Sequence, residues 1–507
     1  MLNALAFPSL GWWPLAWIGT PLILLSLVGR SVKSALLVGA GAGAVFWGMH
    51  IFWLTVYLGP APWAALVMLQ TLFFGLFCTL IALAWRFTDR AGNHWWLRYL
   101  IAPAVIGGLW VARETVTSTW PYGGFSWGRL AFSQSESPFG DLASWVGVTG
   151  LSFIMAAMSA LLAQFARRTR PVSLPRNVGI AAVALTVVVS VPSFPVVTNG
   201  TLRVGAVQGN ADAGLFSRPA PGEILDNHIA ASEPLVGQDA DVVVWPENAS
   251  DIDPLRNNPA ARALTRISEQ LGAPLITGTL TQSGTDDFNS LLLWDGEGGA
   301  VDQYDKLHPV PFAEYLPDRE FWTPLAPELF SLIPRDFTRG SRDNIFTVAN
   351  LRAGLAICFD IVDDALIRQM MADGAQIIIS PTNNADFGRS DQSIQQLAIA
   401  RIRAIETGRS VVNVSTVGVS AIIDPSGRTM TQLPTFQPGT MLANVPLSDT
   451  ITPATAAGGR FDAIPTLIGL AGLVLTGVIT RRTPPHERVR VNRTRGGVVR
   501  WGARILR

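Results

Sequence analysis

Residues 354–361 of this chain read Gly-Leu-Ala-Ile-Cys-Phe-Asp-Ile, an apolar run that leads into Cys358 and continues to Asp360. The run is typical of a buried strand that ends on an exposed thiol, and a strand end is a rigid mount for a nucleophile. The chain has two cysteines, and Cys78 lies in a long apolar run, so we expect Cys358 to be a free thiol. A lone cysteine in such a segment is more often a small buried hydrophobe, so the rest of the sequence has to decide.

Composition divides the chain into membrane and soluble parts. Its 507 residues are 49% hydrophobic and 15% charged, with a mean hydropathy of +0.32, whereas soluble globular chains carry about 25% charged residues. Long apolar runs fill residues 1–199, while residues 200–450 have an ordinary soluble composition. We therefore expect a membrane helix bundle (1–199), a soluble domain (200–450), a final transmembrane helix (451–482) and a basic cytoplasmic tail (483–507).

A membrane-spanning helix needs about 20 mostly apolar residues. The hydropathy pattern predicts helices at 14–29, 34–58, 62–85, 98–116, 143–166, 177–196 and 463–480. Lys and Arg gather in alternate loops between these helices, and cytoplasmic loops carry such an excess. The domain at 200–450 then lies on the exterior side of the membrane, in a periplasm-like space, and the chain crosses the membrane several times.

The same reasoning places residue 1 outside. Residues 1–13 resemble the tail of a helix whose beginning is missing, or an N-terminal segment that lies in the membrane interface. A cleaved signal peptide fits poorly, because no basic region precedes the apolar stretch.

Two glycine-containing stretches of the membrane part need an interpretation. Gly39, Gly41 and Gly43 have the spacing of a nucleotide-binding loop, but they lie in an apolar helix, so we expect close helix packing instead. The outward loop from Trp120 to Trp127 is aromatic, glycine-rich and on the same side as the soluble domain. It is either an interfacial loop or part of a lipid-facing active site.

The soluble part alternates strands and helices. Strand-like segments occur at 201–208, 240–245, 274–280, 289–294, 345–350, 353–358, 375–380, 410–416, 419–424 and 440–445. Helical patterns occur near 223–236, 259–271, 363–373 and 392–407. About 250 residues in this pattern predict a layered α/β domain with its own core.

Three polar residues follow apolar strands in this domain: Glu247, Lys306 and Cys358. A carboxylate, an ammonium and a thiol suit acyl transfer through a thioester, because a carboxylate can take the thiol proton. A lysine ammonium and a backbone N–H can then stabilise the negative charge on the attacked carbonyl oxygen. Each residue alone is more often a surface or capping group, and only the three together favour catalysis.

The motifs around these residues resemble the nitrilase superfamily. Glu247 in "WPEN", Lys306 in "YDKLHPVPFAEYLP" and Cys358 in "ICFDI" are similar to the superfamily's Glu-Lys-Cys triad. The segments "TWPYGGFSWGRLAFSQ" (119–134) and "ARIRAIETGRSVVNVSTVGVSAIIDPSG" (400–427) resemble its membrane branch, the apolipoprotein N-acyltransferases. The resemblance spans residues 5–480 and implies a polytopic α-helical membrane bundle plus an αββα sandwich.

The resemblance also implies a reaction. Cys358 would take an acyl chain from a membrane phospholipid as a thioester, and the N-terminal amine of a diacylglyceryl-cysteine in a lipoprotein would then accept it. Glu247 would be the general base, and Lys306 would hold the oxyanion with the N–H of Phe359. By the same likeness, supporting residues would be Glu314, Phe359, Asp360 and Asn289.

Some residues depart from the family's pattern. The family commonly has Cys-Tyr-Glu where this chain has Cys358-Phe359-Asp360, and Asp386 stands where an aromatic residue is usual. Phe216 stands near the place of an expected loop tryptophan. These changes bear on closure of the site and on substrate choice more than on the triad.

Two other functions stay open from the residues alone: a membrane-tethered nitrilase-like amidohydrolase, and a catalytically silent paralogue that acts as a scaffold. The five histidines are scattered without paired-ligand spacing, so we expect no metal and no cofactor. The arginine-rich tail is a juxtamembrane segment rather than a sign of nucleic-acid binding. We expect a monomer.

Overall fold

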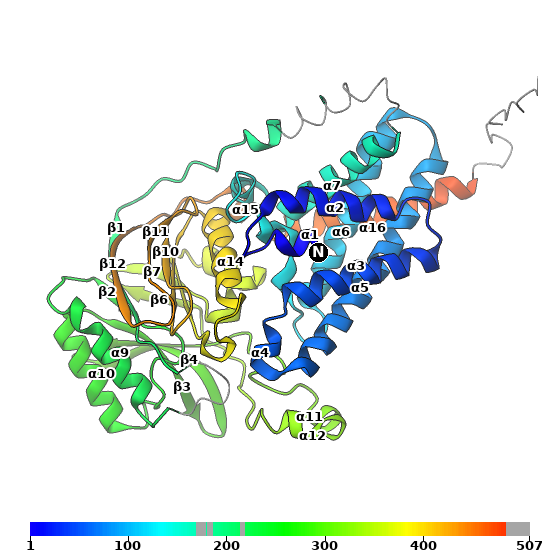
Figure 1. The fold of residues 1–507 in the computed structure, drawn as a ribbon. Coiled ribbons are helices and arrows are strands. Elements are labelled where there is room, and N and C mark those ends of the chain that lie inside the picture. Colours follow the sequence, from blue (N-terminus) through cyan, green and yellow to red (C-terminus); the bar gives the residue numbers. More distant parts are fainter. Residues whose placement is uncertain (169–178, 180–185, 213–218, 483–507) are drawn as a thin grey trace, which may run out of the picture.

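The computed structural model describes residues 1–168, 179, 186–212 and 219–482. It has two parts, a helical bundle and a two-sheet domain, which lie side by side (Figure 1). Of the helix expected at 177–196, residues 177, 178 and 180–185 lie outside the described residues, whereas residues 191–196 are described and are not helical. Phe216 and the basic tail also lie outside the described residues.

The bundle is built from the N-terminal helices and the last helix of the described chain. Its elements are α1 (Leu2–Leu5), η1 (Trp13–Leu15), α2 (Ala16–Ser26), α3 (Val32–His50), α4 (Leu54–Leu58), α5 (Pro60–Ala91), the π-helical η2 (Leu97–Ile101), α6 (Ala102–Thr119), η3 (Ser126–Gly128), η4 (Leu130–Gln134), η5 (Gly140–Leu142), α7 (Ala143–Arg168), α15 (Pro453–Ala457) and α16 (Arg460–Arg482). Among the described residues, five helices are long and apolar enough to cross a membrane.

The bundle corrects two of the expected spans. The helix expected at 14–29 is only 11 residues long in α2, which is shorter than a bilayer requires. The helix expected at 34–58 ends at His50 and resumes as α4. Hydropathy alone does not register this break, because the residues on both sides of it are apolar.

The glycines of α3 confirm close packing at two positions of three. A side chain at Gly39 would collide with Cys78 of α5, and one at Gly43 would collide with Phe74, whereas Gly41 faces open space. Helices α6 and α16 also approach closely, since a Cβ atom on Gly108 would lie 2.4 Å from the backbone nitrogen of Gly469. Small residues thus allow these helices to meet backbone to backbone.

The second part contains two six-stranded sheets. The first has the order β12-β1-β2-β3-β4-β5 and the second β11-β10-β9-β8-β7-β6. The strands are β1 (Thr201–Gln208), β2 (Val242–Val244), β3 (Leu275–Ser283), β4 (Asp286–Asp295), β5 (Gly299–Asp305), β6 (Ile345–Val348), β7 (Leu351–Leu355), β8 (Ile377–Thr382), β9 (Ser410–Ser415), β10 (Ala421–Ile423), β11 (Thr429–Gln432) and β12 (Gly439–Pro446). Parallel pairs β1–β2–β3 and β7–β8–β9 form the centre of each sheet.

Helices cover the outer faces of both sheets. The domain's helices are α9 (Glu223–Ser232), η7 (Glu233–Leu235), α10 (Asn258–Leu271), α11 (Arg319–Trp322), η8 (Thr323–Leu325), α12 (Pro327–Phe330), η9 (Cys358–Val362), α13 (Asp364–Ala372), η10 (Ala385–Phe387) and α14 (Gln392–Thr407). Apolar side chains of the two sheets form one buried core between them, and a second core lies under α9 and α10. The domain is therefore an αββα sandwich, as the resemblance implies.

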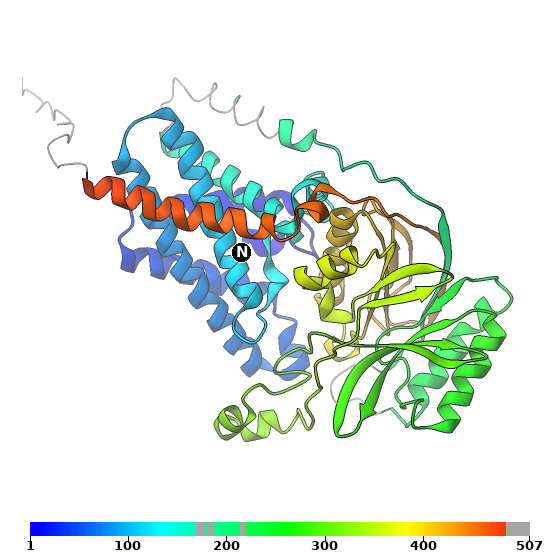
Figure 2. The same cartoon turned by 180° about the vertical axis from the view of Figure 1, so that it is seen from behind.

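The helix layer on the second sheet is shared with the bundle. Buried residues of α13 and α14 belong to the same apolar cluster as those of α2, α6 and α7. Figure 2 shows α14 and its neighbours between the second sheet and the bundle. The strand ends that precede α13 and α14 are thus held close to the membrane part.

The strand predictions from sequence are incomplete. They omit β5 and β11, and the segment expected at 353–358 ends at Leu355. Cys358 therefore opens a 3-10 turn instead of ending a strand. Only two of the seven residues of β5 are buried and three are exposed, so the strand lacks the apolar run by which the other strands were predicted.

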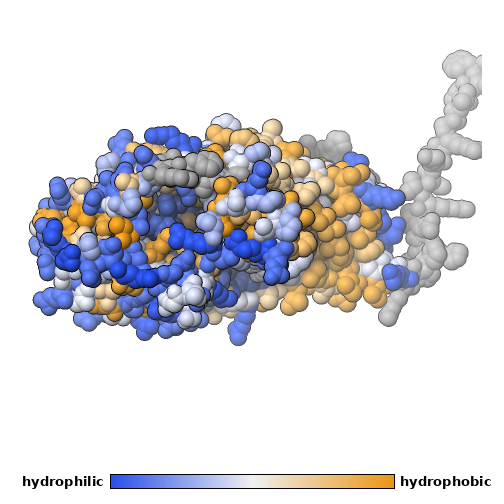
Figure 3. Space-filling model, turned by 90° about the horizontal axis from the view of Figure 1, so that it is seen from below, coloured by the Kyte–Doolittle hydropathy of each residue, from blue (hydrophilic) through white to orange (hydrophobic). Residues whose placement is uncertain are grey.

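Surface hydropathy follows the division into two parts. Figure 3 shows a mixed, largely hydrophilic surface over the sandwich and a hydrophobic one over the bundle. Exposed apolar side chains of the bundle include Leu37, Met68, Leu467 and Val474. An exposed hydrophobic surface of this kind is what a lipid-facing bundle requires.

Candidate active site

The three expected catalytic residues lie just after three strands. Glu247 follows β2, and Lys306 follows β5, so both come from the first sheet. Cys358 follows β7 of the second sheet. The sandwich therefore brings together side chains that are separated by more than a hundred residues in the chain.

Lys306 and the two glutamates form a buried group that we call the lysine cluster (Glu247, Lys306, Glu314). The Lys306 Nζ lies 2.9 Å from Glu314 Oε2 and 3.6 Å from Glu247 Oε1. Side-chain exposure is 2% for Lys306 and 5% for Glu247. The single ammonium group of Lys306 is therefore the ion-pair partner of both carboxylates, in a site that is largely shielded from water.

Donors on neighbouring segments orient both carboxylates. The Asn289 amide donates from Nδ2 to Glu247 Oε1 and to Glu314 Oε1, each at 2.7 Å. The backbone N–H of Asn383 donates to Glu247 Oε2 at 2.6 Å, and that of Val310 donates to Glu314 Oε2 at 2.6 Å. Asn289 and Glu314 therefore belong to the same site as the trio, as the resemblance implies.

The electrostatics of the site favour proton exchange. Burial raises the pKa of Glu247, with Glu314 adding to the effect and Lys306 opposing it. Burial alone would lower the pKa of Lys306, but Glu314 and Glu247 more than reverse this, so it stays protonated. Burial and the Glu247 carboxylate raise the pKa of Cys358 to about 12. The resting thiol is thus neutral, next to a carboxylate with increased proton affinity.

Residues Cys358–Val362, which we call the cysteine turn, hold the thiol in an unusual backbone conformation. Cys358 has a φ of +52°, a left-handed value that costs a non-glycine residue about 1–3 kcal/mol. Asp360 Oδ2 stabilises the turn by accepting from the Ile357 N–H at 3.2 Å and from the Tyr304 hydroxyl at 3.0 Å. Burial raises the pKa of Asp360 to about 7, against the effects of Lys306 and His308.

Two aromatic side chains of the bundle stack on the cysteine turn. The Phe359 ring lies 6.1 Å from that of Trp127 at an interplanar angle of 4°, and 6.0 Å from that of Phe125 at 14°. Both partners belong to the loop that the sequence left as interfacial or site-lining. The structure places the end of this loop against the residue that follows the cysteine.

Further contacts between the bundle and the sandwich hold the aromatic side chains around the cysteine turn in place. The indole N–H groups of Trp53 and Trp127 both donate to Gln395 Oε1 of α14, at 3.1 and 2.6 Å. Phe387, beside Asp386, contacts Trp53 and Tyr57 at centroid distances of 5.2 and 5.0 Å. The bundle therefore supplies aromatic surface around the site from two separate segments.

His308 joins the segments that carry Lys306 and Cys358. Its Nδ1 lies 2.9 Å from Asp363 Oδ2. A side-chain hydrogen bond to Asp363 raises the pKa of His308 despite partial burial. This pairing suits a positioning role rather than that of a base.

Sequence reasoning missed some groups that contact Glu247 and Cys358. Asn383, whose N–H binds Glu247, comes directly after β8, and Thr382 forms a side-chain hydrogen bond with the Cys358 thiol. Both follow the buried apolar run Ile377–Ile379, so the strand-end rule that found the trio could also have found them. Within the described part of the chain, no cluster of metal-ligating side chains occurs.

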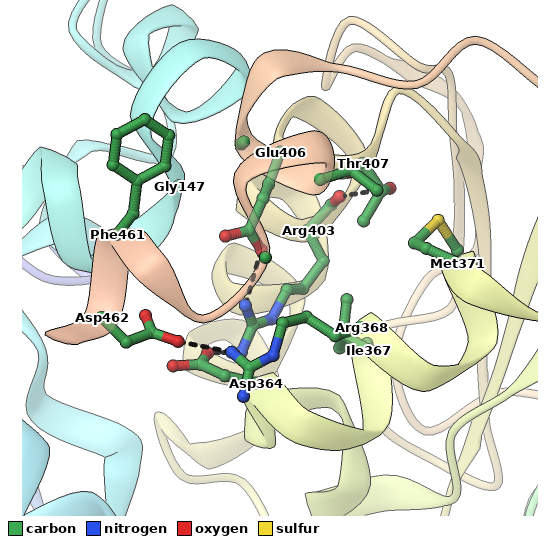
Figure 4. A pocket seen from close by; sticks show the side chains of 13 residues that line it. Gly147, Asp364, Ile367, Arg368, Met371, Arg403, Glu406, Thr407, Phe461 and Asp462 are labelled. Atoms are coloured by element: carbon green, nitrogen blue, oxygen red, sulfur yellow. Dashed lines mark hydrogen bonds and ion pairs between the residues drawn. The ribbon is translucent and has the colours of Figure 1, made fainter.

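A small cavity lies elsewhere, where α13 and α14 meet α7, α15 and α16. Its volume is about 30 Å³, and its charged lining side chains are Asp364, Arg368, Arg403, Glu406 and Asp462 (Figure 4). Room for one or two water molecules is too little for a lipid. The catalytic trio does not line this cavity.

Comparison with known families covers most of the chain. Residues 1–161 match the family description "Apolipoprotein N-acyltransferase N-terminal domain". Residues 203–453 match the description "Carbon-nitrogen hydrolase". The two matches divide between the bundle and the sandwich.

Similar proteins span nearly the same length. The chain is 31% identical to the apolipoprotein N-acyltransferase of Mycolicibacterium smegmatis, over 95% of this chain and 84% of the relative. It is 29% identical to that of Shewanella oneidensis, over 95% and 94%. A solved amidase of the nitrilase superfamily from Nesterenkonia is 18% identical, covering 52% of this chain and 96% of its own, with a TM-score of 0.39.

Proposed function

From the premise that this chain belongs to the apolipoprotein N-acyltransferase family, we propose how it carries out N-acylation of lipoproteins. The acyl donor is a membrane phospholipid, and the acceptor is the N-terminal amine of a diacylglyceryl-cysteine. The acyl group passes through a thioester on Cys358. Glu247 is the general base, and Lys306 stabilises the oxyanions.

In the first half-reaction, Glu247 takes the thiol proton as the sulfur attacks the ester carbonyl carbon. A general base is needed because the pKa of the thiol is raised to about 12, so the free thiolate is scarce near neutral pH. The tetrahedral intermediate then breaks its carbon–oxygen bond. The lysophospholipid hydroxyl leaves with the proton that Glu247 held, and the acyl group stays on the sulfur.

In the second half-reaction, the amine of the lipoprotein attacks the thioester carbonyl. Glu247 takes a proton from the attacking nitrogen, an amide bond forms and the carbon–sulfur bond breaks. The proton returns to the sulfur, which restores the thiol. The base therefore ends each half-reaction in its starting state.

Both steps place negative charge on a carbonyl oxygen. Lys306 is suited to stabilise that charge because its ammonium is buried and is already oriented by Glu314 at 2.9 Å. The backbone N–H of Phe359, which follows the nucleophile, is the second donor. Fixed donors in a dry site stabilise an oxyanion more than water does.

The observation that carries this proposal is the meeting of the three strand ends beside the bundle's aromatic loop. The base, the ammonium and the thiol interact electrostatically within one buried site. Phe359 stacks on Trp127 and Phe125 of the membrane part. A thioester there is close to lipid and shielded from water, which limits its hydrolysis.

The chain is a bacterial multi-pass membrane protein. We place it in the inner membrane with the sandwich on the periplasmic side. The connection between α2 and α3, which carries Arg30, lies at the end of the bundle that is remote from the sheets (Figure 1), and Lys33 follows in the first turn of α3. Cytoplasmic loops carry such positive charge.

The family membership favours neither the amidohydrolase nor the silent scaffold. An amidase that acts on soluble substrates has no use for the aromatic contacts between bundle and cysteine turn. A silent scaffold has no use for a lysine cluster that is oriented by Asn289 and two backbone N–H groups. The proposed enzyme acts as a monomer, because each catalytic group comes from one chain.

The test is the intact mass of the purified protein after incubation with phospholipid, before and after neutral hydroxylamine. A fatty-acyl increment on the Cys358 peptide that hydroxylamine removes is the expected result. Adding a diacylglyceryl-peptide should then discharge the increment into an N-acylated product. Cys358→Ala serves as the control that folds but carries no increment.

Two outcomes would overturn the proposal. If folded wild-type protein gains no increment from several phospholipids, the thioester route is wrong. If the thioester forms but is lost to water as fast with the diacylglyceryl-peptide as without it, the amidohydrolase is the better description.

A further inference from the structure

A second buried group of charges lies behind the cysteine turn, which we call the arginine cluster (Arg129, Asp364, Arg403, Glu406). Figure 4 shows Arg403 close to Glu406 and Asp364, at the place where the sandwich meets the bundle. The Arg403 side chain is only 1% exposed. None of these residues has a part in the proton transfers of the proposed reaction.

Arg403 donates hydrogen bonds to the end of the cysteine turn. Its Nε donates to the carbonyl oxygen of Ile361 at 2.9 Å, and its Nη2 donates to that of Val362 at 2.9 Å. These are the last two residues of the turn that begins at Cys358. A guanidinium presents its donors in a planar, rigid fork, so it fixes the direction of both carbonyls.

Two carboxylates hold Arg403 in place. Asp364 Oδ1 accepts from Nη2 at 2.6 Å, and Glu406 Oε2 accepts from Nη1 at 2.6 Å. Burial opposes the charge on Asp364, but Arg129 and Arg403 keep its pKa well below the usual range. Asp364 therefore stays ionised near neutral pH, and the pairing is permanent there.

Groups of the bundle donate hydrogen bonds to the second oxygen of each of these two carboxylates. Arg129, in the loop between α6 and α7, donates from Nη1 to Asp364 Oδ2 at 2.6 Å. The N–H of Val148 in α7 donates to Glu406 Oε1 at 2.9 Å. Val148 follows Gly147, whose φ of +70° kinks the helix and turns that N–H toward the acid.

The same loop contacts the cysteine turn at its other end. Phe125 and Trp127 stack on Phe359, next to Cys358, while Arg129 reaches Asp364, just past Val362. The turn is thus clamped at both ends by one membrane loop. The contacts at both ends are needed because Cys358, the first residue of the turn, has a left-handed φ. Without surrounding contacts, such a residue would return to a conformation of lower energy.

We propose that Arg403, with Asp364 and Arg129, is a positioning device that holds the cysteine turn in its reactive conformation only while the sandwich is docked on the bundle. The proposal rests on the proposed function, since it takes Cys358 as the nucleophile. The arginine cluster sets where the sulfur and the Phe359 N–H stand relative to Lys306. It transfers no proton and contacts no substrate.

The test compares Arg403→Lys and Arg129→Gln with wild type in the single-turnover rate of Cys358 acylation by phospholipid. Lysine keeps the charge of Arg403, but its three N–H donors on one nitrogen cannot reproduce the hydrogen bonds to two carbonyls and two carboxylates. Arg129→Gln leaves the Arg403–Asp364 pair intact and removes the ion pair between the loop and Asp364, together with the hydrogen bond from Arg129 to Thr149 of α7. We expect the acylation rate to fall about 10- to 100-fold, because small displacements of a reacting atom have effects of that size.

The phospholipid concentration that gives half the maximal rate should not change. Arg401→Gln is the matched control. Arg401 lies on the same helix and pairs with Glu136 of the bundle at 3.6 Å, but it has no contact with the cysteine turn. It should acylate within twofold of wild type.

A purely structural role would give a different result: less folded protein, of which each molecule reacts at the wild-type rate. The amplitude of the acylation burst counts the folded enzyme, so the rate constant can be compared directly. Wild-type rate constants in both variants would overturn the proposal, and if Arg403→Lys fails to fold, Arg129→Gln decides alone. Absence of an acyl-enzyme in wild type itself would instead overturn the proposed function.

Discussion

Two buried charge clusters lie on either side of the cysteine turn, and they differ in balance. The lysine cluster has one cation for two carboxylates, whereas the arginine cluster has two guanidinium groups for two carboxylates. Accordingly the pKa of Glu247 is raised, chiefly by burial, while that of Asp364 is lowered by Arg129 and Arg403 against burial. In the lysine cluster, one cation is shared by two carboxylates, and Glu247 can bind a proton more readily than an ordinary carboxylate. In the arginine cluster, Asp364 has two guanidinium partners and binds a proton less readily.

The comparison separates chemistry from positioning. A general base must exchange protons near the working pH, which requires a raised carboxyl pKa. A structural ion pair must not exchange protons there, since protonation would leave an arginine buried without a partner. The difference predicts opposite responses of the two clusters to substitution and to pH.

The largest effect is expected for Glu247→Gln. The amide keeps the shape and can still accept from Asn289, but it cannot take the thiol proton. Loss of a general base lowers rates by about 10²- to 10⁴-fold. The acylation rate of Cys358, measured by intact mass after rapid quenching, should fall in this range, while exposed Glu297→Gln should not change it. A wild-type rate would remove Glu247 from the base role.

Lys306→Met should lower both rate and stability. The acylation rate should fall about 10²- to 10³-fold, because an oxyanion donor is lost. Two carboxylates are then buried without a cation, which costs about 3 kcal/mol or more of unfolding free energy. The chain has two lysines, so Lys33→Met is the matched control.

The pH response of Lys306→Met follows from the sign of the linkage. Lys306 lowers the pKa of Glu247, so its removal raises that pKa further. The folded form then binds more protons than the unfolded chain, and stability falls as pH rises. The deficit relative to wild type, from thermal unfolding in detergent, should be smaller at pH 5 than at pH 8. An equal deficit at both pH values would contradict this account of the lysine cluster.

Asp364→Asn should show the reverse pattern. It leaves Arg129 and Arg403 facing each other, which costs about 3 kcal/mol. The pKa of Asp364 is depressed, so its contribution is present above the unfolded value near 3.9 and is lost only in acid. The stability deficit should therefore be constant from pH 5 to pH 8. Asp373→Asn at the end of α13 is the control, and a deficit that varies in this window would place Asp364 among the exchanging groups.

The smallest effect is expected for His308→Gln. The His308–Asp363 pair is partly exposed, at 35% and 27%, so it contributes less than about 1 kcal/mol. The pKa of His308 is raised mainly by Asp363, so the contribution is present below the unfolded value and disappears as pH rises past the folded one. Thermal unfolding at pH 6 should separate the variant from wild type more than at pH 9.

Much of the site could be predicted because its motifs are local. Glu247, Lys306 and Cys358 each follow a strand, and Asn289, Glu314 and Phe359 entered with them through the resemblance. The prediction placed the sulfur at a strand end, whereas the structure begins a 3-10 turn there. The spans expected at 14–29 and 34–58 were wrong because α2 ends at Ser26 and α3 ends at His50, each next to further apolar residues, so a hydropathy average cannot detect the helix ends.

The sequence by itself determined which residue types are present at strand ends and which segments are apolar enough for lipid. These properties depend on neighbours within a few residues, so they can be read along the chain. Only the tertiary structure decided that the Asn383 N–H meets Glu247, that Phe359 stacks on Trp127, and that Arg403 joins the cysteine turn to Arg129. Such contacts join segments that are far apart in sequence, and their energy exists only once the sheets and the bundle have packed together.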